Sequence, residues 1–384
     1  MGTMGASPTD NMDEARLQFT VIEQPEAMAG LREEWQQLLQ QSSANPLFCS
    51  WELADIFWRH YADDDSCALR LVCVREGGQL LAIFPFYISR HRILRVVPVR
   101  TLLWLGSGGD TSPDYLGAIV HTRAGQHFDN WLAEALALLR HEFDVAELRD
   151  MQRAPDIDEL RQDARVPLLH SRLSRREIIV AELVPDWDDY LARLSSNRRQ
   201  QIRRARRKVF EQEGILLDRL SSVDQLDHWF DQLVRLHHKR WQQKGEGEHA
   251  FRTDAYNRFH REFMAAMLDG NALRLWGLKK NDQLIAMLYC LSDGNETYYF
   301  QGGFDTDYDE LKPGMVLMSC AMEQAIREGC CRFDMMKGDY DFKRSLAKDS
   351  AFTWDLQMIR PTPAGLFYRL RFIALPALKR VLKK

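Results

Sequence analysis

One short segment near the C-terminus gathers side chains that can transfer protons and stabilise charge. It runs as FDMMKGDYDFK and contains Asp334, Asp339, Tyr340 and Lys343. A carboxylate can act as a base, a phenol can donate a proton, and an ammonium group can stabilise a developing negative charge. A capped turn with exposed charges uses the same residue types, so each residue taken singly fits both interpretations.

A second candidate site lies at the start of a predicted helix, in the segment LKPGMVLM. Pro313 stands at the first helical position, where a missing N–H costs nothing. Unpaired N–H groups and the helix dipole favour an anion at such a helix end. Lys312 adds a cation and Gly314 lets the backbone approach a ligand closely, so the predicted anion site comprises Lys312, Pro313, Gly314 and Met315. The alternative is an ordinary junction between a loop and a helix.

The segment HHKRW on a predicted helix places His237, Arg240 and Trp241 close together as candidate substrate-binding residues. Adjacent histidines on a helix point to different faces, and no carboxylate or cysteine stands at ligand spacing from them. We therefore predict no metal site. Trp241 is expected to be half-buried, which leaves Arg240 available for an acidic acceptor.

Seven basic residues without an intervening acid crowd one predicted helix. They are Arg198, Arg199, Arg203, Arg204, Arg206, Arg207 and Lys208. Like charges at this density destabilise a helix unless an anion lies nearby. A solvated helix, a CoA or phosphorylated-acceptor contact, an anionic lipid surface and nucleic acid are the alternatives. No aromatic residue interrupts the run, so we expect no nucleic acid, and we take Arg203 as a candidate substrate contact.

The C-terminal segment GLFYRLRFIALPALKRVLKK is basic and amphipathic. Such a segment can pack on the body of the protein or lie on an anionic membrane surface, and packing is the favoured interpretation. Residues 363–384 are therefore predicted to form a basic amphipathic tail that packs on the body of the protein or contacts an anionic membrane peripherally.

Length and composition set the frame for these candidates. The chain has 384 residues, 45% of them hydrophobic, and a formal net charge of -4, so it should fold as two domains with two cores and without bulk attraction to polyanions. Seven cysteines without a CxxC pair favour a reduced, cytoplasmic compartment. No stretch is long and apolar enough to cross a bilayer, and residues 1–16 are predicted to be a disordered leader.

An internal repeat organises the chain. The segment LRLVCVREGGQLLA, residues 69–82, aligns without a gap with LRLWGLKKNDQLIA, residues 273–286, and each is typical of a β-hairpin. A predicted helix precedes each hairpin, with Ser50 and Thr253 as the N-caps. A helix followed by an FD-containing strand comes after each hairpin, so three elements recur in the same order.

The repeat predicts two tandem α/β units. The polar stretch from Met151 to Ser174 separates them, so we predict one unit over residues 17–165 and a second over residues 175–362. Each unit should hold a mixed sheet, with antiparallel strands followed by a crossover helix. The predicted fold class is α/β, or α+β with a mixed sheet.

This order of elements resembles the GNAT acyltransferase fold, and in particular that of bacterial GNAT-type acetyltransferases of cellulose and exopolysaccharide biosynthesis, which are related to the Fem-type peptidyltransferases. The resemblance covers most of the chain. It is carried by LSSNRRQQIRRARRKVFEQEG, by HHKRWQQKG, by the stretch from YYFQGGF to MMKGDYDFKR, and by WLGSGGDTSPDYLGAIV in the first half. The resemblance also marks the pair Arg240 and Trp241 as recurrent.

The sequence departs from the family pattern at two places. Phe342 stands where a tyrosine is expected, which leaves Tyr340 as the nearby phenol. The glycine-rich phosphate loop of the wider superfamily is absent, and KPGM remains at the corresponding helix start.

The resemblance implies acetyl-CoA or another acyl-CoA as co-substrate, bound where two parallel strands separate. Those strands would be TYYFQGGF and RFDMM, with Gln301, Gly302 and Gly303 lining the cleft and the helix start at Lys312 holding the phosphates. The resemblance also implies two tandem GNAT-like domains. The first is expected not to bind CoA, because it ends in ELRDMQRAPD and lacks the Gly-Asp…Lys ending of the second.

Acyl transfer needs a base, donors for the oxyanion and an acid for the leaving thiolate. We assign Asp339 or Asp334 as the base or as an acceptor-binding carboxylate. Tyr340 is assigned as the proton donor for the thiolate and Lys343 as the charge stabiliser. The function implied is N- or O-acylation of an envelope or polysaccharide precursor such as an amino sugar. An aminoacyl-tRNA-dependent transferase of the Fem type and a non-catalytic scaffold for an anionic partner are the alternatives.

Overall fold

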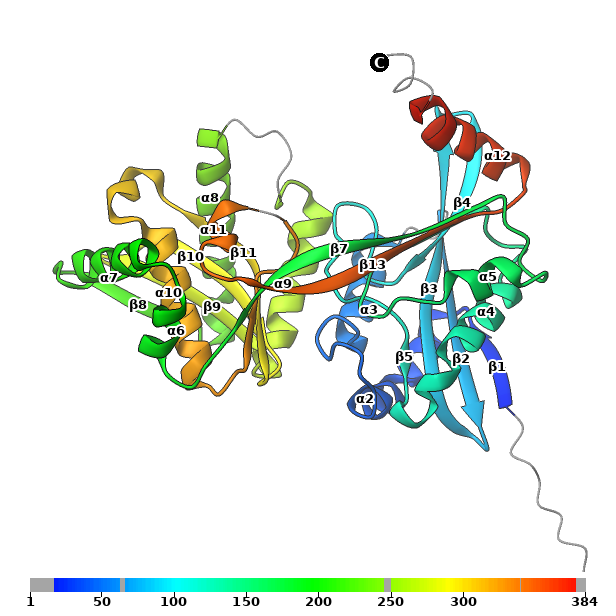
Figure 1. Ribbon diagram of the computed structural model, residues 1–384, viewed down its shortest axis with the longest axis horizontal. Coiled ribbons are helices and arrows are strands. Elements are labelled where there is room, and N and C mark those ends of the chain that lie inside the picture. The colour runs from blue at the N-terminus through cyan, green and yellow to red at the C-terminus, as the bar shows by residue number, and fades with distance from the viewer. Residues whose placement is uncertain (1–16, 63–65, 245–249, 339, 378–384) are drawn as a thin grey trace, which may run out of the picture.

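The computed structural model describes residues 17–62, 66–244, 250–338 and 340–377 (Figure 1). The predicted leader and the end of the tail lie outside these residues. The elements of the first half are β1 (Leu17–Ile22), α1 (Pro25–Gly30), α2 (Arg32–Gln40), α3 (Trp51–Tyr61), β2 (Cys67–Glu76), β3 (Gln79–Ile93), β4 (Val97–Trp104), β5 (Ile119–Val120), η1 (Thr122–His127), α4 (Phe128–Leu138), β6 (Val145–Met151) and α5 (Ile157–Gln162).

The second half continues the chain with a similar order of elements. They are β7 (His170–Glu182), α6 (Trp187–Arg193), α7 (Ser196–Phe210), β8 (Ile215–Arg219), η2 (Val223–Gln225), α8 (Leu226–Lys244), α9 (Asp254–Asp269), β9 (Leu273–Lys280), β10 (Gln283–Ser292), β11 (Glu296–Phe304), η3 (Thr306–Leu311), α10 (Pro313–Arg327), β12 (Arg332–Asp334), α11 (Asp341–Arg344), β13 (Asp349–Ile359), α12 (Pro363–Arg369) and η4 (Leu370–Ala374).

The two predicted hairpins are confirmed as β2–β3 and β9–β10, both antiparallel. Each follows a helix whose predicted cap is also confirmed. Ser50 accepts a hydrogen bond from the Leu53 N–H at the start of α3, and Thr253 accepts one from the Tyr256 N–H at the start of α9. The predicted mixed sheet is present in both halves, because β4 runs parallel to β6 and β11 runs parallel to β12.

The sheets of the two halves are joined into one. Its order is β1-β2-β3-β4-β6-β13-β7-β12-β11-β10-β9-β8, with β5 paired to β3. The long strands β7 and β13 pair with each other and cross between the halves (Figure 1). β13 belongs to the end of the chain but pairs with β6 of the first half, while β7 pairs with β12 of the second. The two halves are therefore held in register by backbone hydrogen bonds.

The hydrophobic core does not divide by half, contrary to the expected pair of separate cores. The largest cluster joins α3 of the first half to α9 of the second, where the rings of Phe57 and Phe259 lie 6.4 Å apart. A second cluster fills the other face of the second half's sheet beneath α6, α7 and α10. Both faces of β10 and β11 are covered, which explains their long apolar runs.

Several element boundaries differ from the sequence prediction. The predicted basic helix begins as a separate element, because α6 ends at Arg193 and Ser195 caps α7 by accepting a hydrogen bond from the Arg198 N–H. Strands β8 and β13 were not predicted. β12 ends at Asp334, and the residues after it leave the sheet, with Met336 in the left-handed region at φ 55°.

Candidate functional site

The parallel strands β11 and β12 separate soon after they meet. They pair only at Glu296 with Arg332, Thr297 with Phe333 and Tyr298 with Asp334, while β11 continues to Phe304. The register between β10 and β11 shifts at the same level, where Phe300 is the extra residue of a bulge. Beyond Tyr298, the edge of β11 that faces β12 is therefore not used by the sheet.

A cavity of about 1270 Å³ lies between the two halves and reaches this edge. From the second half it is lined by Tyr299, Phe300 and Gln301 of β11 and, after β12, by Met335, Met336, Lys337, Tyr340, Phe342 and Lys343. From the first half it is lined by the hairpin β3–β4 and by the loop 107–114. Large concave sites between two packed bodies are the usual place for ligands, so the cavity is the candidate site.

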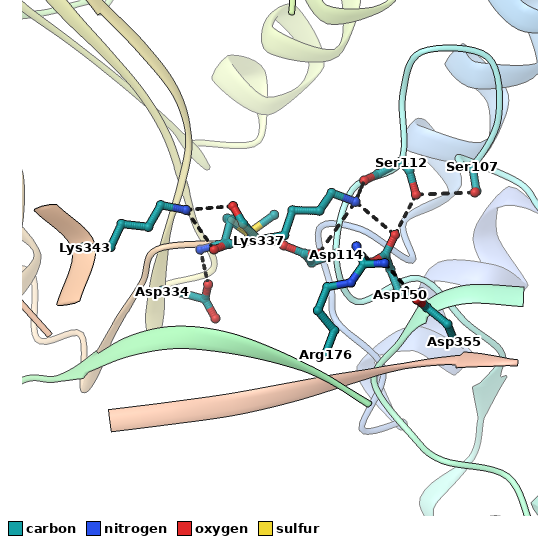
Figure 2. A network of polar contacts seen from close by, with 10 residues as sticks. Ser107, Ser112, Asp114, Asp150, Arg176, Asp334, Lys337, Lys343 and Asp355 are labelled. Carbon is teal, nitrogen blue, oxygen red and sulfur yellow. Dashed lines mark hydrogen bonds and ion pairs between the residues drawn. The ribbon is translucent and has the colours of Figure 1, made fainter. Parts of the chain in front are cut away.

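A network of polar groups crosses between the halves at one side of the cavity (Figure 2). The Lys337 N–H donates to Asp114 Oδ2 at 2.6 Å, and Lys337 Nζ donates to Asp150 Oδ2 at 3.0 Å. Lys337 Nζ also donates to the Ser112 carbonyl oxygen. Arg176 of β7 binds Asp150 at 3.3 Å and Asp355 of β13 at 2.8 Å. Five separate segments meet in this network.

The most unusual group in the network is Asp114, which lines the cavity. Its side chain is 0% exposed, and its Oδ1 has no hydrogen-bond donor among the described residues, the nearest cation being Lys337 Nζ at 3.8 Å. Burial raises the pKa of Asp114 to about 7, the Lys337 ammonium opposes that rise, and the neighbouring Asp150 adds to it. Asp114 is a carboxyl group poised to exchange a proton near neutral pH.

The turn after β12 is held by Lys343 and Asp334. Lys343 is 3% exposed, and its Nζ donates to the carbonyl oxygens of Met336 at 3.0 Å and Lys337 at 2.7 Å. Asp334 Oδ1 accepts the Met336 N–H at 2.6 Å. These bonds hold Met336 in its left-handed conformation and aim Lys337 at the first half.

Comparison with known proteins agrees with this geometry. Residues 196–344 match the model of the acetyltransferase (GNAT) domain family. The solved structure of FemX superposes with a TM-score of 0.60 at 11% identity, over 88% of this chain and 98% of that one. The chain has a GNAT-type acyltransferase fold.

Two further solved structures superpose on most of this chain. The C-terminal domain of a putative lysylphosphatidylglycerol synthetase from Agrobacterium fabrum has a TM-score of 0.51 at 13% identity, over 89% of this chain and 95% of that one. A conserved protein of unknown function from Bacteroides thetaiotaomicron has a TM-score of 0.52 at 10% identity, over 89% of this chain and all of that one. A search of curated protein sequences found no match.

The predicted catalytic residues are only partly brought together. Tyr340 is 43% exposed and lines the cavity with Lys343, whose Nζ lies 5.5 Å from the Tyr340 ring centre. Asp334 is fully buried and does not line the cavity. Its Oδ2 accepts a hydrogen bond from Tyr115 of the first half, so both oxygens are engaged. Burial raises the pKa of Asp334 to about 6. Asp339 lies outside the described residues.

Of the residues predicted to line the cofactor cleft, Gln301 lines the cavity. The two glycines after it serve packing instead. A Cβ on Gly303 would lie 2.3 Å from the His237 backbone nitrogen, and one on Gly302 would lie 3.1 Å from the Met287 carbonyl oxygen. Gly303 thus lets helix α8 lie directly on β11.

The predicted anion site at the start of α10 has no cap from a described side chain. Lys312 takes the left-handed conformation at φ 50°, and Pro313 is buried at the first helical position. Lys312, Pro313, Gly314 and Met315 are not part of the cavity lining. The basic helix α7 lies beside them, because Lys208 Nζ donates to the Glu310 carbonyl oxygen at 2.9 Å.

The candidate substrate-binding residues fall in different places. Arg240 and Trp241 line the cavity, and Arg240 lies over the Phe304 ring at 5.3 Å. His237 is completely buried beside Phe251, with the ring centres 5.1 Å apart. Arg203 is an exposed residue of α7, where it pairs with Asp188 at 2.7 Å, and it does not line the cavity.

Asp114 and Lys337 were missed by the sequence analysis. A carboxylate inside the Gly-rich and Ser-rich segment WLGSGGDTSPDYLG was a usable signal for Asp114. No local pattern marks Lys337, because its partner stands 223 residues earlier in the chain. Within the described residues, no group of three metal-ligating side chains comes together, and no helix has the length and apolarity needed to span a membrane.

Proposed function

We propose that this protein transfers an acyl group from acyl-CoA to an amine or hydroxyl of a polar acceptor. The donor would lie in the gap between β11 and β12, with its pantetheine arm along the free edge of β11. Its phosphates would reach the uncapped start of α10 beside the basic helix α7. The observation that carries this proposal is the free β11 edge opening onto a cavity that also holds a buried carboxyl group.

The acceptor would be activated by Asp114. Its unpaired Oδ1 would take the proton of the acceptor N–H or O–H as the nucleophile attacks the thioester carbonyl. The carbon–sulfur bond then breaks, and the CoA thiolate takes a proton from Tyr340, the phenol predicted for this role. Lys337 would stabilise the ionised form of Asp114 before the attack.

The acceptor is proposed to carry an anionic or hydroxyl-rich group, as an amino sugar or another envelope precursor does. Support comes from the cations of the cavity lining, which are Arg92, Arg149, Arg240, Arg252, Arg371, Lys337 and Lys343. The acids of the lining are Asp110, Asp114 and Glu147. The excess of cations favours an acidic acceptor.

A second candidate donor is an aminoacyl-tRNA. The exposed arginines of α7, such as Arg204 and Arg207, offer cations to a phosphate backbone. The longest described helices do not form a projecting arm, however, since α8 packs on β11 and α9 packs on α3. We therefore favour the acyl-CoA donor.

A thermal-shift assay tests the donor directly. Acetyl-CoA should raise the melting temperature of the protein, because a ligand that binds only the folded state stabilises it. Gly314→Asp should abolish the shift by placing a carboxylate at the uncapped helix end. Gly314→Ala is the matched control, since its Cβ meets the same Phe304 atom at 3.1 Å without adding charge.

Two outcomes of this assay count against the proposal. The absence of a shift in the wild type would exclude a CoA donor, and a shift with aminoacyl-tRNA alone would favour the second candidate. Equal shifts in the Asp and Ala variants would remove the start of α10 from the donor site.

A further inference from the structure

Exposed apolar side chains concentrate where α12 and η4 pack beside the β3–β4 hairpin. Of the large hydrophobic residues that are exposed among the described residues, two occupy the turn between β3 and β4 and four occupy α12, η4 and the next residue. They are Leu94 (64% exposed), Val96 (70%), Leu366 (52%), Leu370 (54%), Phe372 (47%) and Leu375 (39%). Contiguous exposed apolar surface of this kind marks an interaction site.

These two groups lie on neighbouring elements. The inner face of α12 and η4 packs Phe367, Tyr368 and Ile373 onto a small cluster formed by Ile93, Val99 and Ile359. Figure 1 shows α12 beside β4 at this end of the molecule. The helix therefore already buries one apolar face, and the exposed residues form a second face that the rest of the described chain does not cover.

The turn between β3 and β4 has an unfavourable backbone conformation at two residues with exposed side chains. Leu94 has φ 52° and Arg95 has φ 61°, a left-handed pair at which glycine or asparagine is the ordinary choice. A bulky leucine and an arginine there are retained against local preference. Such strain is typical of positions whose side chains serve a contact.

The charged side chains of the two segments themselves are all cationic. The β3–β4 segment from residue 89 to 101 contains no acid, and neither does the chain from residue 363 onward. The cations of this surface are Arg90, Arg92, Arg95, Arg369 and Arg371. Burial lowers the pKa of the nearby His170, and Arg369 and Arg172 lower it further, as expected beside a positive surface.

We infer that α12, η4 and the β3–β4 turn form a docking surface for an anionic lipid bilayer. Apolar side chains ringed by arginines are the pattern of helices that lie in the headgroup region of a membrane. A second copy of this chain would set like charges against each other across a twofold axis, which disfavours a homodimer. Ile93, Leu94, Arg371 and Phe372 also line the large cavity, so docking would bring that end of the cavity to the lipid surface.

Co-sedimentation of the full chain with vesicles tests the docking surface. The protein should pellet with vesicles of phosphatidylcholine mixed with phosphatidylglycerol, and not with phosphatidylcholine alone. The double variant Leu94→Ser with Phe372→Ser should bind at least roughly tenfold more weakly. The matched control is Leu216→Ser with Val223→Ser, since those side chains are 60% and 61% exposed on the other half.

A further variant separates the two contributions to binding. Arg95→Gln with Arg369→Gln should lose binding to the anionic vesicles while keeping the fold, because both side chains lie on the surface. Failure of the wild type to pellet with the anionic vesicles would overturn the docking surface. Equal binding by the Leu94, Phe372 variant and its control would do the same.

Sedimentation velocity without lipid tests whether the surface instead binds a second copy of the chain. A wild-type dimer that the Leu94, Phe372 variant dissociates would assign the surface to a second copy and overturn the lipid partner. The vesicle assay needs no acyl donor. Failure of the wild type to bind these vesicles, together with an intact acetyl-CoA thermal shift, would therefore contradict the docking surface and leave the proposed function standing.

Discussion

At the scale of single residues, the site depends on the environment of Asp114 rather than on its sequence neighbours. The same carboxyl in water would ionise near pH 4 and would be a weak base. In the folded protein, burial raises the pKa of Asp114 to about 7. The Lys337 ammonium, 3.8 Å from Oδ1, limits that rise. Lys343 serves differently, since its Nζ donates to the backbone carbonyl oxygens of Met336 and Lys337 and so shapes the turn that carries Lys337.

Replacing the proposed base should change both the rate and its pH dependence. In the wild type, acyl transfer should rise with pH through about 7, because Asp114 must lose its proton to act. Asp114→Asn keeps an acceptor for the Lys337 N–H but should lower kcat about 10²–10⁴-fold and flatten the profile. The release of CoA thiol from acetyl-CoA, followed from pH 5 to 9, measures both.

The control for this experiment is Asp110→Asn. Asp110 also lines the cavity, but it is exposed and accepts hydrogen bonds from Tyr61 and Thr253. This variant should keep the rise near neutral pH. An Asp114→Asn enzyme with the wild-type profile would remove Asp114 from the chemistry.

At the scale of elements, the site exists because two strands stop pairing. β11 runs on after β12 has ended, and the same arrangement recurs in the first half, where β4 and β6 pair only at Thr101 with Val145 and Leu102 with Ala146. In the second half, helix α8 lies so close to β11 that a glycine is required between them. That contact fixes the position of the edge that faces the cavity.

Gly303→Ala should destabilise the fold because the new methyl group has nowhere to go. Its Cβ would lie 2.3 Å from the His237 nitrogen and 2.4 Å from the Leu236 carbonyl carbon, which are backbone atoms of α8. We expect a loss of about 1–3 kcal/mol in the free energy of unfolding, measured by urea denaturation. Gly302→Ala should lose less stability, because its new Cβ would lie 3.1 Å from the flexible Leu288 side chain and no atom would lie closer. An equal loss would show that α8 can move.

At the scale of the whole molecule, the two halves share one sheet, one large core and one polar network. Arg176 of β7 and Asp355 of β13 belong to the crossing strands and both bind Asp150 of the first half, which also accepts a hydrogen bond from Lys337 of the second (Figure 2). The cavity is bounded by both halves, so neither half alone contains the proposed site. In Figure 1 the paired strands β7 and β13 cross between the two halves.

The buried carboxyls of this shared region should make stability depend on pH. The folded state holds a proton on Asp114 up to about pH 7, whereas the unfolded chain releases it near pH 4, as an aspartate in water does. The free energy of unfolding should therefore fall as pH rises between these values, and Asp334, with a pKa of about 6, adds in the same direction.

Asp114→Asn should become more stable relative to the wild type as pH rises from 5 to 8, by on the order of 2 kcal/mol, because Asn cannot ionise. Urea denaturation at several pH values measures the difference. Burial also lowers the pKa of His260 to about 3, which destabilises the folded state as pH falls. Both proteins contain His260, so its contribution cancels when the variant is compared with the wild type. A difference that does not change with pH would contradict the raised pKa of Asp114.

The sequence by itself determined the local elements. Hairpins, helix caps and the repeated order were predictable because each depends on residues a few positions apart, as with Ser50 and Leu53 or Thr253 and Tyr256. The mixed sheet and the segment around Tyr340 and Lys343 followed from the same local patterns and from the family resemblance.

Only the tertiary structure decided which side chains face the cavity. Asp114 and Lys337 meet across 223 residues, and β13 leaves its own half to pair with β6. Burial, which sets the pKa of Asp114 and engages Asp334 with Tyr115, depends on that long-range packing. A charge in the sequence has no environment until the chain around it has folded, so the chemistry of the site could not be predicted from residue types alone.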